Sequence, residues 1–222
     1  MHVSDGILPV EVCIAGYAVA LGVAAMCSRR LETEEVPRMG MLAAATFVAS
    51  LVNVPVAGVS IHFGLFGLVG LLLGLRAVPV VFAVLVLQTF LFQHGGFLSL
   101  GVNVVNMASG ALLGAAAGRF LPGPVWLRAA VAGFLGIFVP ALLLLAEFQL
   151  AGYGRSLLLL AAVYAAVAVI EGAFTSAVVV FLERAKPALL SRMHLAATPS
   201  FPLPAVPDPA RAATTGSSKE LG

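Results

Sequence analysis

The chain has 222 residues, of which 61% are hydrophobic and only 10% are charged, and its formal net charge is +2. The mean hydropathy of +1.07 exceeds what the core of a water-soluble domain requires. Several stretches stay apolar over roughly the 18 residues of a membrane span. These values exclude a water-soluble domain, and the small net charge gives no indication of a nucleic-acid partner. We therefore expect an all-α, polytopic transmembrane helix bundle.

The chain begins Met1-His2 and enters an apolar run within a few residues. Three nitrogens of this dipeptide can bind one metal ion: the terminal amine, the His2 backbone amide and the His2 Nδ1. Amine and amide close a five-membered ring with the metal, and amide and Nδ1 close a six-membered ring. Such a planar nitrogen set suits Ni(II) or Cu(II). The fourth position requires one more nitrogen, so the other histidines of the chain matter.

This chelate requires a free, unprocessed N-terminus. Residues 1–6 contain no Lys or Arg and include Asp5, whereas the basic pair Arg29-Arg30 follows the first apolar run. A secretory signal peptide has the reverse layout. A residue as bulky as His at position 2 also blocks removal of the initiator methionine. We therefore expect Met1 to remain and the first apolar run to be a membrane span.

Arg76 and Pro79 separate the third and fourth of seven predicted spans. With the N-terminus outside, 11 of the 12 Lys and Arg residues lie on the inner side and only Arg155 lies outside. This bias predicts an outer N-terminus and a cytoplasmic C-terminus. Residues 1–186 form the predicted transmembrane metal-capture domain, and 187–222 a Pro- and Ala-rich, disordered cytoplasmic tail. The predicted spans are about 7–28, 39–55, 63–75, 77–92, 101–120, 125–149 and 156–184.

The predicted orientation places His2, His62 and His94 together at the outer face, and His194 at the cytoplasmic face. A single His in a loop is rarely a metal ligand, but here three of the four histidines share one face. His94 also opens the turn His94-Gly95-Gly96, which allows the backbone to bend sharply. These three histidines are therefore the candidates for a metal site.

Polar residues follow at the outer start of the fifth span. Asn103 and Asn106 are three residues apart and share a helix face. With Gln88 they would line an outward-facing pocket, although Asn103 could instead cap its helix or bond a neighbouring one. Glu171 lies near the middle of the last span, where a carboxylate is costly enough to be a functional candidate. No basic residue is an obvious partner for it at that depth, and its role stays open.

Small residues also recur every fourth position within several of the predicted spans. Gly110, Gly114 and Gly118 form one such series, and Gly70 and Gly74 form another. Such series allow helices to approach one another closely. Packing within the bundle is the favoured interpretation, and a docking face for another membrane subunit is the alternative.

Taken together, these segments resemble the substrate-capture subunit of energy-coupling-factor nickel and cobalt importers, the NikM/CbiM family. The resemblance implies that the terminal amine of Met1, the amide and imidazole of His2, and His62 bind the metal. It also places His94, Asn103 and Asn106 around these ligands, where such groups orient imidazoles. The matching stretches are Met1-His2-Val3-Ser4-Asp5-Gly6-Ile7-Leu8-Pro9, Val59-Ser60-Ile61-His62 through Gly67-Leu68-Val69-Gly70, and Leu91-Phe92-Gln93-His94-Gly95-Gly96 leading to Gly101-Val102-Asn103-Val104-Val105-Asn106-Met107.

The resemblance further implies a multi-pass subunit of the cell (inner) membrane without catalytic activity of its own. The chain has no Gly-x-x-x-x-Gly-Lys phosphate loop, so ATP hydrolysis would fall to two partner ABC-type ATPase subunits. A transmembrane scaffold subunit would couple them to this chain, and a small accessory membrane subunit is a further expected partner.

The transported ion is expected to be Ni(II), with Co(II) as the alternative. The run Val59-Ser60-Ile61-His62-Phe63 lacks the Cys and Pro that flank this His in the cobalt branch of the family. A planar four-nitrogen site also favours Ni(II) over Co(II). Cu(II) would bind such a site more tightly still, so selectivity must also rest on availability or fit.

Two other classes of membrane protein are less well supported by the sequence. An intramembrane hydrolase is suggested by Ser109-Gly110, but the serine lacks the flanking Gly of a rhomboid-type motif and no His-Glu-x-x-His is present. A seven-helix photoreceptor would need a lysine within a span, whereas Lys186 and Lys219 are both predicted to be cytoplasmic. A proton-coupled carrier would need a series of ionisable groups within the spans, and Glu171 alone does not form one.

Overall fold

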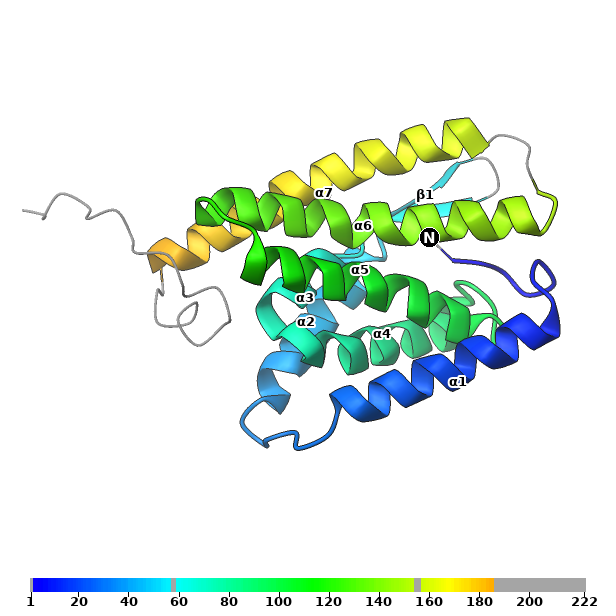
Figure 1. The fold of residues 1–222 in the computed structure, drawn as a ribbon, viewed down its shortest axis with the longest axis horizontal. Helices are drawn as coiled ribbons and strands as arrows, with labels where there is room; N and C mark the ends of the chain where they lie inside the picture. Colours follow the sequence, from blue (N-terminus) through cyan, green and yellow to red (C-terminus); the bar gives the residue numbers. More distant parts are fainter. Residues whose placement is uncertain (1, 57–58, 154–156, 186–222) are drawn as a thin grey trace, which may run out of the picture.

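The computed structural model describes residues 2–56, 59–153 and 157–185. Met1, Arg155, Lys186, His194 and the predicted tail, 187–222, lie outside these ranges. The described residues contain seven α-helices in the order of the seven predicted spans, which confirms the all-α class (Figure 1). These helices are α1 (Val10–Cys27), α2 (Val36–Ala49), α3 (Phe66–Leu73), α4 (Ala77–Phe92), α5 (Leu100–Phe120), α6 (Val125–Leu150) and α7 (Leu157–Ala185).

Five stretches of the described chain are long and apolar enough to cross a membrane, when Phe66–Phe92 is taken as one. That stretch is not a single rod: a 3₁₀ turn, η1 (Gly74–Arg76), separates α3 from α4, and Figure 1 shows the chain reversing direction there. Gly74 makes this possible with φ 58° and ψ −128°. Helix α2 has 14 residues, about 21 Å of helix and less than a bilayer core. Seven crossings and the orientation stay predictions.

The predicted second span is wrong at its C-terminal end. Helix α2 stops at Ala49, and residues 53–56 form strand β1 (Asn53–Val56) instead of helix. β1 pairs antiparallel with β2 (Val59–His62), in a register that sets Asn53 opposite His62. Pro55 cannot donate a helical hydrogen bond, and the surrounding Val and Ile residues favour extended backbone. The hairpin ends at His62 and so places this histidine against the helix bundle.

Helix α5 lies at the centre and packs against α1, α3, α4 and α6, while α6 also contacts α3 and α7. Glycines allow these approaches. A side chain on Gly70 of α3 would overlap the carbonyl oxygen of Ala111 on α5, and one on Gly136 of α6 would overlap the backbone of Gly67. The predicted small-residue series therefore contribute to packing inside the bundle.

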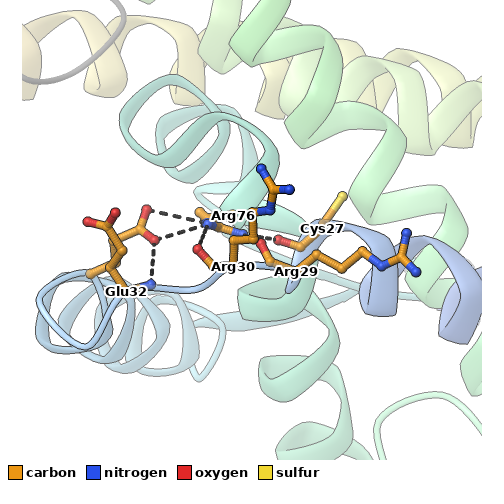
Figure 2. Close-up of polar contacts among 6 residues, drawn as sticks. Cys27, Arg29, Arg30, Glu32 and Arg76 are labelled. Atoms are coloured by element: carbon orange, nitrogen blue, oxygen red, sulfur yellow. Dashed lines mark hydrogen bonds and ion pairs between the residues drawn. The ribbon is translucent and has the colours of Figure 1, made fainter.

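Arg76 holds several chain segments together at the start of α4, the end of this helix that lies away from His94 (Figure 2). Its guanidinium donates to the carbonyl oxygens of Cys27 at 2.6 Å, Arg29 at 2.8 Å and Arg30 at 2.9 Å. It also pairs with the Glu35 carboxylate at 3.1 Å. A planar guanidinium can make all these contacts at once, whereas a lysine ammonium cannot. Arg76 thus fixes the end of α1, the following loop and the start of α2 against the α3–α4 turn.

Gly70→Ala is predicted to destabilise the bundle by about 1–3 kcal/mol, because the added methyl group overpacks the α3–α5 contact. Thermal unfolding in detergent measures this as a lower Tm. Gly22→Ala in α1 is the matched control, since nothing lies within 4 Å of the added atom. That control should leave Tm unchanged or raise it, because Ala is the better helix former. Equal Tm values for the two variants would contradict the packing account.

Candidate metal centre

The segment before α1 folds back onto the bundle, as the dark blue trace in Figure 1 shows. Its first described residues are buried: His2 is 9% exposed and Val3 is fully covered. Chain ends are usually poorly ordered unless something holds them. The burial of this segment therefore requires specific contacts.

Asn103 and Ser99 supply these contacts by binding the main chain of Val3. The Val3 N–H donates to Oδ1 of Asn103 at 2.8 Å, and the Asn103 side-chain amide donates to the Val3 carbonyl at 3.0 Å. The Ser99 hydroxyl donates to the same carbonyl at 2.8 Å. Both main-chain polar groups of Val3 are thus satisfied from the start of α5, which fixes the position of His2 directly before it.

Asp5 makes a second attachment to the same helix start. Its Oδ1 accepts the Ser99 N–H at 2.9 Å and lies 2.9 Å from the Ser99 Oγ, whose single proton it shares with the Val3 carbonyl. Burial alone would raise the pKa of Asp5, but hydrogen bonds from Ser99, Leu98 and Phe97 outweigh it and hold the pKa below its ordinary value. A carboxylate is also favourable at a helix N-terminus. Asp5 therefore stays ionised and holds the segment on α5.

Three imidazole rings meet at this end of the bundle, from three separate segments. The ring centroids of His2 and His62 are 5.0 Å apart, and that of His94 lies 6.1 Å from His2 and 5.9 Å from His62. Nε2 of His2 lies 3.0 Å from Nε2 of His62, although 60 residues separate them in the chain. The structure therefore brings together all three histidines that the sequence placed at the outer face.

The protonation pattern of two of these rings follows from their partners. Nδ1 of His62 lies 3.0 Å from the carbonyl oxygen of Phe63, and a carbonyl can only accept, so this nitrogen carries the proton. Nε2 of a neutral His62 is then an acceptor, and Nε2–H of His2 donates to it. Nδ1 of His2 is left unprotonated. This is the ring nitrogen that the predicted chelate uses.

All three imidazoles are held neutral. Burial, then the positive N-terminus, lowers the pKa of His2 well below its ordinary value and that of His62 to about 3. The same two causes, in the same order, lower the pKa of His94. Neutral imidazoles keep the lone pairs that metal binding needs, so the site is prepared for a cation near pH 7.

His94 reaches the site through a tight turn after α4. Gln93 and Gly95 both have positive φ, 54° and 76°. A side chain on Gly95 would lie 2.9 Å from Nδ2 of Asn103 and 3.2 Å from Cβ of His2. Glycine at position 95 therefore permits both the left-handed backbone of the turn and the close approach of the N-terminal segment.

Side chains alone do not complete a metal centre here. Within the described residues, no three His, Cys, Asp or Glu side chains are arranged to hold a metal ion. A site at His2 and His62 would thus need main-chain nitrogens as well. The His2 amide is one such nitrogen; the other that the sequence predicts, the Met1 amine, lies outside the described residues.

Other candidates from the sequence have different surroundings. Asn106 donates to both carboxylate oxygens of Glu147, at 3.0 and 3.1 Å. Gln88 is fully buried, and its side-chain amide has no hydrogen-bond partner within the described part of the chain. The Ser109 hydroxyl donates to the Asn106 carbonyl of its own helix at 2.7 Å, a local contact that gives the hydrolase hypothesis no support.

Comparison with known proteins also indicates a metal-transport protein. Residues 2–189 match the family described as the cobalt uptake substrate-specific transmembrane region, CbiM. The chain belongs to this family. It is therefore a multi-pass membrane protein, and the resemblance to NikM/CbiM proteins is confirmed.

Relatives of the CbiM family carry both nickel and cobalt in their names. A candidate fused nickel transport protein (NikMN) of Archaeoglobus fulgidus is 31% identical, over 86% of this chain and 68% of its own. A cobalt transport protein (CbiM) of Geobacter sulfurreducens is 32% identical, over 87% of this chain and 62% of its own. The chain spans between 55% and 68% of the length of three curated relatives that it matches.

The fold also matches a solved structure. A truncated transition-metal transporter superposes with a TM-score of 0.76 at 25% identity, covering 83% of this chain and 99% of that one. The helix bundle described above is thus the fold of a known metal transporter.

Asn103→Ala is predicted to release the N-terminal segment, because Val3 loses both of the contacts that Asn103 makes. Hydrogen exchange of a peptide covering residues 2–9 should speed up markedly. Asn106→Ala, one turn along the same helix face, is the matched control and should leave that peptide protected. Unchanged exchange in Asn103→Ala would show that Asn103 does not hold the segment.

Proposed function

We propose that the chain captures Ni(II) at the outer face of the cell (inner) membrane, as the substrate-specific subunit of an energy-coupled importer. The observation that carries this proposal is the meeting of His2 and His62, with nitrogens 3.0 Å apart, beside a buried and anchored N-terminal segment. A protein has little structural reason to bury His2 against two further neutral histidines. A cation bound by the lone pairs of these imidazoles gives such a reason.

The proposed ligands are the Met1 amine, the His2 amide and Nδ1, and Nε2 of His62. The anchoring of Val3 fixes the His2 peptide, and the Phe63 carbonyl leaves Nε2 of His62 as the lone-pair nitrogen. A metal bound to Nδ1 of His2 and Nε2 of His62 would break the hydrogen bond between the two rings, while Nε2 of His2 would keep its proton. Loss of the His2 amide proton makes binding stronger as pH rises.

Nickel is proposed over cobalt from the donor set. Four nitrogens, one of them a deprotonated amide, favour the square-planar geometry of Ni(II). The names of the relatives include both metals, so the choice rests on this chemistry. Co(II) capture by the same site is the alternative.

Uptake is proposed to depend on partners: a transmembrane scaffold subunit, two ABC-type ATPase subunits and a small accessory membrane subunit. The chain itself would supply the metal site and no catalysis. Its capture step can therefore be measured on the purified subunit alone, without ATP.

Calorimetric titration of the purified subunit with Ni(II) and Co(II) tests this proposal. Loss of a surrounding group costs about 10–100-fold in metal affinity, so loss of a ligand in His2→Ala or His62→Ala should cost more. One residue added before Met1 should weaken binding as severely, because it moves the amine away from the chelate. His194→Ala is the control and should bind as the wild type does.

Two results would contradict the proposal. Unchanged Ni(II) affinity in the extended protein would remove the terminal amine from the ligand set. Tighter binding of Co(II) than of Ni(II) would overturn the metal assignment and leave cobalt capture as the function.

A further inference from the structure

Glu171 of α7 has a partner that its sequence position did not suggest. The side chain is fully buried, and Oε1 accepts the main-chain N–H of Gly64 at 2.5 Å. The N–H of Leu65 lies 3.2 Å from Oε1 and 3.0 Å from Oε2. The carboxylate thus binds the short segment between β2 and α3, 107 residues away in the chain. That segment directly follows His62.

This segment needs such an anchor. Leu65 has a left-handed backbone with φ 51°, which is unfavourable for a residue with a side chain. The N–H groups before α3 also have no partner within the helix. A carboxylate with two acceptor oxygens satisfies both N–H groups and is favourable at the N-terminus of α3.

The bundle is built so that α7 can reach this segment. Gly133 of α6 faces α7, and a side chain there would crowd the Glu171 carbonyl and the Thr175 hydroxyl. Gly67, in the first turn of α3, lies equally close to the backbone of α6 at Ala132. The small residues of α6 therefore bring α3 and α7 to its two sides, close enough for one side chain to bridge them.

The contact extends to the ring of His62 through a single peptide unit. The Gly64 N–H that Glu171 accepts and the Phe63 carbonyl that accepts Nδ1–H of His62 belong to the same peptide bond. This unit is planar, so fixing its N–H also fixes the direction of its C=O. Hydrogen bonds in series also polarise one another. The chain of contacts runs from the carboxylate through the peptide to the imidazole.

We propose that Glu171 is the positioning residue for His62. Through the Phe63–Gly64 peptide it holds the imidazole in the Nδ1–H form, with Nε2 directed at His2. Metal-binding histidines commonly have their second nitrogen fixed by such an outer partner, which orients the ring and strengthens the ligand. The effect on metal affinity rests on the proposed function; the effect on the ring form does not.

The first test needs no metal. Nitrogen NMR of the protein labelled with ¹⁵N-histidine distinguishes the Nδ1–H from the Nε2–H form, and His62→Ala assigns the His62 signals. The wild type should show the Nδ1–H form. Glu171→Gln should give a mixture of both forms, because an amide places a donor against one of the two N–H groups. Thr175→Val, one turn further along α7 and equally buried, should keep the wild-type signals.

The second test measures Ni(II) affinity in the same variants. Glu171→Gln should weaken binding about 10–100-fold, as loss of an orienting partner does. Glu171→Asp keeps the carboxylate and should recover part of this loss; it also replaces Glu171→Gln in both tests if that variant does not fold. In a His62→Ala background, Glu171→Gln should weaken binding no further, because the residue that it positions is gone.

The outcomes separate the two proposals. An unchanged His62 ring form in Glu171→Gln overturns the positioning role whether or not the protein binds nickel. An equal loss of affinity in Thr175→Val, or a further loss in the His62→Ala background, also overturns it, because a general packing defect then explains the effect. A wild type that binds no Ni(II) contradicts the proposed function, and the NMR result alone then decides the role of Glu171.

Discussion

The attachment of Val3 to the start of α5 is the interaction on which the rest of the site depends. Two hydrogen bonds with Asn103, one in each direction, and one from Ser99 hold the main chain of Val3, which is fully buried. Without them the first residues would be free to move in solvent, as chain ends usually are. With them, His2 meets His62 and His94. The ordering entropy of the segment is thus lost on folding and not when a metal binds.

The remainder of the bundle keeps this arrangement rigid. Glycines let α3, α5 and α6 approach to backbone contact, and Arg76 holds chain segments together at the start of α4. Glu171 adds a tie from the last helix to the segment behind His62. Each device holds main chain in place, which suits a site whose proposed ligands include two main-chain nitrogens. Placement of such ligands is a property of the whole fold and not of a side-chain cluster.

The helices and the grouping of the three histidines could be predicted from the sequence, because hydropathy and charge distribution carry that information. Apolar length located the helices, and the charge bias placed His2, His62 and His94 together. The hairpin was missed, because four-residue strands inside an apolar run leave no hydropathy signal. The partner of Glu171 was missed because it was sought among basic side chains, whereas main-chain N–H groups supply it. Asp5 and Ser99 were missed as contacts, since each could equally be a local turn or cap residue.

Nickel K-edge absorption spectroscopy of the wild-type protein, loaded with one equivalent of Ni(II), tests the central claim most directly. The account predicts four nitrogen ligands in a plane, with the scattering pattern of two imidazoles and the edge feature of square-planar Ni(II). A six-coordinate shell of nitrogen and oxygen would contradict it, because the metal would then be held without the amine–amide chelate. A planar site with a single imidazole would retain the N-terminal chelate and exclude His62.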